Sequence, residues 1–175
     1  GGLYIRYDRG VLSKGDNVRW GHQPSLDGTK ILTRQTADCI IGTFDDGGYY
    51  VTNSVHTTVL QAGVRDFHLK YILGVLNSRL LSFYYRKLIF EAGQVFSQVK
   101  LVNLRQLPIK QASCEEQREM VALVDALLQA NRAAEQAEQR LHALVCGLYR
   151  LTPGEIALVE RECFPANPLF TGLSA

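Results

Sequence analysis

The apolar pattern at the front of the chain is a series of short segments between residues 30 and 60. These segments are rich in β-branched and aromatic residues and are bounded by Gly and Asp, as β-strands usually are. They cover Ile31 to Thr33, Cys39 to Phe44, Tyr49 to Val51 and Ser54 to Leu60. Because Asp and Gly tolerate the backbone of a tight turn, Asp45-Asp46-Gly47-Gly48 predicts an antiparallel hairpin between the second and third segments.

The apolar spacing then changes to the three-and-four repeat of an α-helix. Asp66 predicts the N-cap of a helix that begins at Phe67. Asn77-Ser78 interrupts the pattern, because both side chains compete for backbone hydrogen bonds, and a second helix is predicted from Arg79 to about Phe90. Residues 95–108 predict a strand and a connecting segment that a proline closes.

A segment of different character begins at residue 113. Ser113 to Glu116 has the pattern of a capping box, in which the serine and the glutamate satisfy each other's free amides. Nine apolar residues then alternate steps of three and four, as a heptad seam requires: Met120, Leu123, Leu127, Ala130, Ala134, Ala137, Leu141, Leu144 and Leu148. They predict one long helix over about 114–149. It would measure about 52 Å and would need a helical partner or a projecting end.

The elements together predict an α+β fold. We expect a mixed, mainly antiparallel β-sheet with a broken helix pair in residues 1–112. A helical segment follows in residues 113–175, with the long helix, a short helix over about 153–162 that a second capping box (Thr152 to Glu155) opens, and a tail. The chain of 175 residues begins with Gly1 and its only methionine is Met120, so we expect a longer parent polypeptide.

The formal net charge of +2 hides an asymmetry along the chain. Residues 1–112 hold 14 Lys and Arg against 8 Asp and Glu, whereas residues 113–175 hold 5 against 9. A basic front that meets a polyanion would explain this division. Two ordinary solvated faces would explain it as well, because excesses of this size arise by chance.

The usual motifs of catalysis and metal binding are missing from the sequence. It contains no HExxH pair, no GxSxG turn, no GxGxxG and no Walker A loop. The four cysteines lack CxxC spacing, which favours reduced thiols and a cytoplasmic protein. No apolar run approaches the ~18 residues of a membrane span. We therefore expect no catalytic residue, no metal site and no membrane partner for this chain.

Five segments of the chain stand in a characteristic order: Lys30 to Gln35, Tyr49 to His56, Leu73 to Ser78, Phe96 to Lys100 and Leu104 to Ile109. This order resembles the C-terminal target-recognition domain of TaqI-like and Eco57I-like adenine-specific DNA methyltransferases, including fused type IIG restriction-modification enzymes. Glu116 to Val121 is also similar to the start of the helices in type I restriction specificity subunits. The resemblance covers roughly residues 30–160.

The resemblance implies a mixed αβ domain over residues 1–112 that reads a short sequence in double-stranded DNA. A separate catalytic domain of the same polypeptide would transfer a methyl group to N6 of adenine, with or without a fused endonuclease. We therefore expect no cofactor in this chain, and S-adenosylmethionine in that catalytic domain. The function expected is target recognition for a type II restriction-modification enzyme.

Residue types narrow the candidate DNA contacts, because Lys and Arg bind phosphates whereas Arg, Lys, Asn, Gln and Ser reach base edges. Three groups qualify: Lys30, Arg34 and Gln35 beside the first strand, Ser97, Gln98 and Lys100 after the helix pair, and Arg19 and Trp20 in the front loop. Each could instead be a solvated side chain, or for Trp20 a core anchor. The alternative function is a protein-interaction domain that docks a helical partner, or a second copy, through the seam at 120–148.

Overall fold

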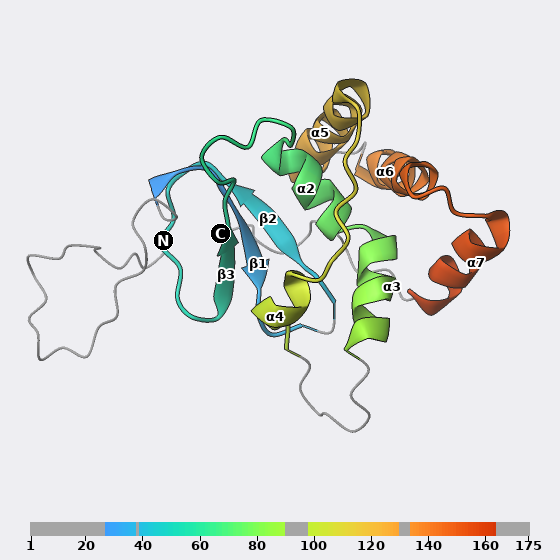
Figure 1. Ribbon diagram of the computed structural model, residues 1–175, viewed down its shortest axis with the longest axis horizontal. Coiled ribbons are helices and arrows are strands. Elements are labelled where there is room, and N and C mark those ends of the chain that lie inside the picture. The colour runs from blue at the N-terminus through green and yellow to red at the C-terminus, as the bar shows by residue number, and fades with distance from the viewer. Residues whose placement is uncertain (1–26, 38, 90–97, 130–133, 164–175) are drawn as a thin grey trace, which may run out of the picture.

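The computed structural model describes residues 27–37, 39–89, 98–129 and 134–163 (Figure 1). A small β-sheet lies beside a group of helices, and the fold is α+β as the sequence predicts. In chain order the elements are β1 (Lys30–Arg34), β2 (Gly42–Asp45), β3 (Val55–Thr58), α2 (Leu69–Leu76), α3 (Arg79–Leu88), α4 (Leu101–Leu104), α5 (Cys114–Leu128), α6 (Ala134–Leu148) and α7 (Pro153–Glu162).

The sheet has the strand order β2-β1-β3, with both pairs antiparallel. The predicted hairpin between β2 and residues 49–51 is therefore wrong, because β2 pairs with β1 and residues 49–51 belong to no strand. The carboxylate of Asp45 explains the difference. It accepts hydrogen bonds from the backbone amides of Gly47 and Tyr49 at 2.9 and 3.0 Å, which ends the strand in a local turn. The predicted strand over 54–60 is confirmed as β3.

Lys30 and Asp45 lie directly opposite each other on β1 and β2. Their side chains form an ion pair at 2.5 Å, and both are almost fully buried, with 0% and 1% of their surface exposed. A charge pair this deep in the protein is costly to separate, because either partner alone would be a desolvated, uncompensated charge. The pair therefore fixes the register of β1 against β2.

The break between the two predicted helices is confirmed. α2 ends at its C-cap Asn77, and the Ser78 hydroxyl caps α3 by accepting from the Leu81 amide at 3.2 Å. The start of α2 differs from the prediction, since its N-cap is His68 rather than Asp66. The carbonyl of Asp66 instead accepts a hydrogen bond from the Gln117 side chain of α5 at 2.7 Å.

α2 covers one face of the sheet and packs on α5, with one close contact on each side (Figure 1). The side-chain amide of Asn77 donates to the Gly42 carbonyl and accepts from the Gly42 amide, both at 2.8 Å. On the other side of α2, a Cβ at Gly74 would lie 2.6 Å from the sulfur of Met120. Glycine at 74 therefore lets α5 approach α2 closely.

The predicted long helix over 114–149 is wrong: the structure has two helices, α5 and α6, with Gln129 as the C-cap of the first. α6 folds back along α5, so that Arg140 forms an ion pair with Glu119 at 3.3 Å. The heptad seam thus finds its helical partner within the chain. Folding back buries most of its described apolar residues, among them Met120, Leu123, Leu127, Ala137, Leu141 and Leu148.

The two capping boxes are confirmed at the starts of α5 and α7. Of the predicted strand and connecting segment 95–108, residues 95–97 lie outside the described part of the chain. Residues 101–104 form the helical turn α4 instead of a strand. One hydrophobic core extends across residue 112, because α5 packs on α2. None of the helices in the described ranges has the length and apolar content needed to cross a bilayer.

Candidate nucleic-acid interface

The end of β1 and the segment before α4 lie side by side, although more than 60 residues separate them in the chain. Thr36 and Gln98 form an antiparallel bridge, and the Val99 amide donates to the Gln35 carbonyl at 2.7 Å. β3 joins them, since Nε2 of His56 lies 2.7 Å from the Val99 carbonyl oxygen. Arg34 and Gln35 of the first predicted group are therefore brought to the same surface as Gln98 and Lys100 of the second.

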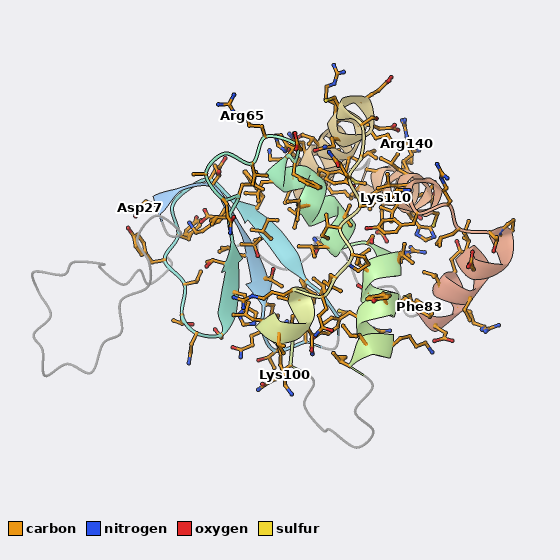
Figure 2. The ribbon with its side chains drawn as sticks, viewed as in Figure 1. Asp27, Arg65, Phe83, Lys100, Lys110 and Arg140 are labelled. Atoms are coloured by element: carbon orange, nitrogen blue, oxygen red, sulfur yellow. The ribbon has the colours of Figure 1, made fainter. Side chains whose placement is uncertain are left out.

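A buried tyrosine of α3 fixes the position of this segment. The Tyr85 hydroxyl donates to the Gln98 carbonyl at 3.1 Å and accepts from the Lys100 amide at 3.3 Å. Its ring is fully buried, as is the side chain of Val99. The exposed side chains of Gln98 and Lys100 therefore extend from a backbone that the core holds in place, and Figure 2 shows Lys100 on the outer side of the molecule beside α4.

Three segments meet at this surface, and none of them contains an acidic residue. Residues 28–37, 50–65 and 98–112 hold no Asp or Glu. Together they carry six bases: Lys30, Arg34, Arg65, Lys100, Arg105 and Lys110. We call the exposed part of these three segments the acid-free surface. Arg34, Lys100 and Arg105 are exposed cations of this surface. Arg65 is exposed as well, but Figure 2 shows it on the side of the molecule away from Lys100. Such a surface attracts polyanions, because no carboxylate within these segments opposes the positive field. Among the described residues, the Asp27 carboxylate lies at its edge, where it accepts a hydrogen bond from the Tyr50 hydroxyl.

Elsewhere in the described part of the chain, three bases of the front half form ion pairs with acids of residues 113–175. Lys70 pairs with Asp125 at 2.5 Å, Arg79 with Glu138 at 3.0 Å and Lys87 with Glu162 at 2.7 Å. These pairs join α2 to α5, α3 to α6 and α3 to α7. Part of the charge asymmetry along the chain is therefore neutralised by ion pairs within the fold.

The predicted site residues divide into three sets. Arg34, Gln98 and Lys100 are exposed on the acid-free surface, and Gln35 is half-buried beside them. Ser97, Arg19 and Trp20 lie outside the described residues. The prediction that Lys30 contacts DNA is wrong. Its ammonium is fully buried against Asp45 and therefore lies below any surface that DNA could contact.

Sequence reasoning missed Arg105. This residue is exposed at the C-cap of α4, one helical turn after Lys100. Among the described residues, no side chain forms a hydrogen bond or ion pair with its guanidinium, and the same holds for Arg34. The signal that could have identified Arg105 is the composition of residues 98–112, which contain three bases and no acid.

A second group of reactive side chains lies between α3, α6 and α7. The sulfur of Cys146 is 3.7 Å from Nε2 of His142, which faces the Glu160 carboxylate at 3.4 Å. Burial lowers the pKa of His142, with the nearby Arg79 acting in the same direction, and burial raises the pKa of the Cys146 thiol. Both groups are therefore held in their neutral forms, the opposite of what an activated thiolate requires.

The exposed cations and amides are typical of a nucleic-acid-binding module, in which such groups contact phosphates and base edges. The comparison with known families is specific. Residues 3–109 match the TaqI-like C-terminal specificity domain, which is more than half of the chain. The chain therefore belongs to the TaqI-like C-terminal specificity domain family. A specificity domain is the non-catalytic part that recognises the DNA sequence. No curated protein matches the chain significantly.

Proposed function

We propose that this chain reads a short sequence in double-stranded DNA through its acid-free surface. The observation that carries the proposal is the meeting of β1, β3 and residues 98–105 in a TaqI-like specificity domain, with exposed cations and amides and no acid in those segments. Arg34, Lys100 and Arg105 supply phosphate contacts, which give affinity and orientation. Gln98, with Gln35 beside it, supplies the amide groups that pair with adenine edges.

The finer assignment is the target-recognition part of an N6-adenine DNA methyltransferase of a type II restriction-modification system, either alone or fused to an endonuclease. Family membership supports the link to a methyltransferase. The catalytic domain, with its S-adenosylmethionine, would belong to another part of the same polypeptide. In that arrangement this chain positions the DNA, and the other domain transfers the methyl group.

The alternative function, docking of a helical partner through the seam at 120–148, has less support. The seam residues with the largest side chains, Met120, Leu127 and Leu141, are buried in the core of this chain. A side chain that already packs against α2 or α6 offers no surface to another helix. Self-association through this seam would require α5 and α6 to separate.

Selection from a pool of randomised DNA duplexes tests the proposal. We expect the 175-residue chain to enrich one short common sequence. Gln98→Ala should relax the preference at one position, since a lost bidentate contact to a base costs about 1 to 3 kcal/mol. Gln139→Ala on α6 is the matched control, because Gln139 is also exposed but lies away from the acid-free surface. Failure of the unaltered chain to enrich any sequence would contradict the proposal.

A further inference from the structure

Two neighbouring aliphatic side chains on α4 are exposed near the proposed DNA surface. Val102 has 61% of its surface exposed and Leu101 has 46%. Val102 is the most exposed of the large apolar side chains in the described ranges. Single exposed apolar residues are ordinary on protein surfaces. Two adjacent aliphatic side chains in one helical turn expose apolar surface, and its binding partner can be inferred from the residues around it.

The turn that carries the pair is held by the core on both sides. Val99 before it is fully buried, and Leu107 after it is 7% exposed. The Gln106 side-chain amide also donates to the Val102 carbonyl at 3.0 Å, which satisfies an acceptor at the end of the turn. α4 therefore presents Leu101 and Val102 from a fixed backbone, so little entropy would be lost when they bind a partner.

The charge around the pair selects the class of partner. Lys100 precedes it and Arg105 follows it, both are exposed, and residues 98–112 contain no acid. One cation before and one after two exposed apolar side chains would complement a partner on which phosphates alternate with apolar groups. In the grooves of DNA the apolar group on a base edge is the C5-methyl of thymine, which lies in the major groove.

We propose that Leu101 and Val102 contact the C5-methyl groups of thymine in the bound DNA, while Lys100 and Arg105 bind the phosphates on either side. This inference rests on the proposed function and extends it to one chemical feature of the recognised sequence. The recognised sequence should then contain thymine at the positions that face α4. The discrimination is apolar, so it is independent of salt, whereas the contacts of the flanking cations weaken as salt rises.

The test uses the selected duplex in two forms, one with thymine and one with deoxyuridine at every thymine position, which differ only in the C5-methyl groups. Affinity is measured by fluorescence anisotropy at several salt concentrations. We expect the unaltered chain to bind the deoxyuridine duplex roughly fourfold more weakly for each methyl group contacted, with the same salt dependence. Equal affinity for the two duplexes would overturn the inference without using any variant.

Variants then locate the methyl contact on α4. The L101S/V102S double variant should bind both duplexes equally, with the affinity that the unaltered chain has for the deoxyuridine duplex. Val102→Thr, which keeps the shape of the side chain, should lose part of the preference. Leu88→Ser on α3, which is 39% exposed, is the control that should keep it in full. A double variant that still prefers thymine would place the contact elsewhere and overturn the inference.

Two results separate this inference from the proposed function. If no duplex is bound, the proposed function fails and the inference fails with it. If the double variant binds DNA normally but loses self-association in sedimentation, the pair belongs to a contact between copies and the inference alone is overturned. The salt-dependent binding through Arg34 and Lys100 would then still support DNA recognition.

Discussion

Two regions of this protein carry polar side chains for opposite purposes. At the junction of α2 and α3, Asn77 and Ser78 are fully buried and their hydrogen bonds are satisfied within the chain. At the acid-free surface, Arg34 and Gln98 are exposed and extend from a backbone that the core holds. The first region fixes the sheet to the helices, whereas the second is available to a partner.

The contrast teaches how to interpret the segments that carry the family resemblance. The described contacts of the segment Leu73 to Ser78 are all packing contacts: Gly74 lets α5 approach, Asn77 binds Gly42, and Ser78 caps α3. Lys30 to Gln35 begins in the interior and ends at the surface. The resemblance segments therefore contain both framework residues and exposed side chains, and specificity must be sought in the exposed ones.

The largest expected effect comes from the buried charge pair. Lys30→Met should lower the free energy of unfolding by about 3 to 5 kcal/mol, because Asp45 would remain buried without its partner. Urea denaturation measures this, and a Lys30→Met/Asp45→Leu double variant should recover part of the loss. Lys100→Met is the exposed control and should leave stability nearly unchanged. A Lys30→Met protein that is stable but binds DNA more weakly would contradict the buried position of Lys30 and would indicate that Lys30 contacts DNA.

The next effect concerns the junction of α2 and α3. Asn77→Ala should destabilise the protein by roughly 2 to 4 kcal/mol, since it leaves both backbone groups of Gly42 without partners in the interior. Asn53→Ala, at an exposed position, is the matched control. The folded Asn77→Ala protein should keep its DNA affinity below its melting temperature. A variant that is stable but does not bind DNA would mean that the junction contributes to the interface.

A smaller effect is expected from pH at the α3, α6 and α7 contact. Because the pKa of His142 is lowered in the folded state, the unfolded chain binds more protons between the folded and unfolded pKa values. Stability is therefore complete above the unfolded value of about 6.5 and declines as pH falls from there toward the folded value. His142→Gln should flatten this part of the stability curve. An identical pH dependence in the variant would show that His142 is not the group responsible.

The smallest expected effect is that of a paired surface base. Lys87→Ala removes the ion pair with Glu162, in which both side chains are partly exposed, so we expect a change of only about 0 to 1 kcal/mol. Its charge is already neutralised, so DNA binding should keep the same salt dependence. A flatter salt dependence would mean that α3 contacts phosphates and that the acid-free surface is only part of the interface.

The sequence predicts well those features that depend on neighbours in the chain. Both capping boxes and the break at Asn77-Ser78 follow from local hydrogen bonding, and all three are present. Pairing between distant segments is different. The turn at Asp45 resembles a hairpin turn in sequence, yet its strand pairs with β1, where Asp45 lies opposite Lys30. Local sequence does not indicate which distant segment a strand will pair with.

The heptad seam illustrates a second limit. Steps of three and four predict that a helical face is buried, and the face is buried. The same pattern cannot distinguish a partner helix from a second half of the same segment folded back, so the predicted long helix was wrong. The sequence pattern also does not show how deeply a charged residue is buried. Lys30 and Arg34 lie on the same strand, but only Arg34 is exposed.

The most direct test of the central claim measures the salt dependence of DNA binding for two triple variants. Arg34→Ala, Lys100→Ala and Arg105→Ala together remove three exposed cations of the acid-free surface, whereas Lys87→Ala, Arg118→Ala and Arg161→Ala remove three cations elsewhere. Each lost phosphate contact should flatten the log-log slope of affinity against salt by about 0.9. We predict a slope flatter by about 2.7 for the first variant and an unchanged slope for the second. Equal slopes in the two variants would contradict the assignment of DNA binding to this surface.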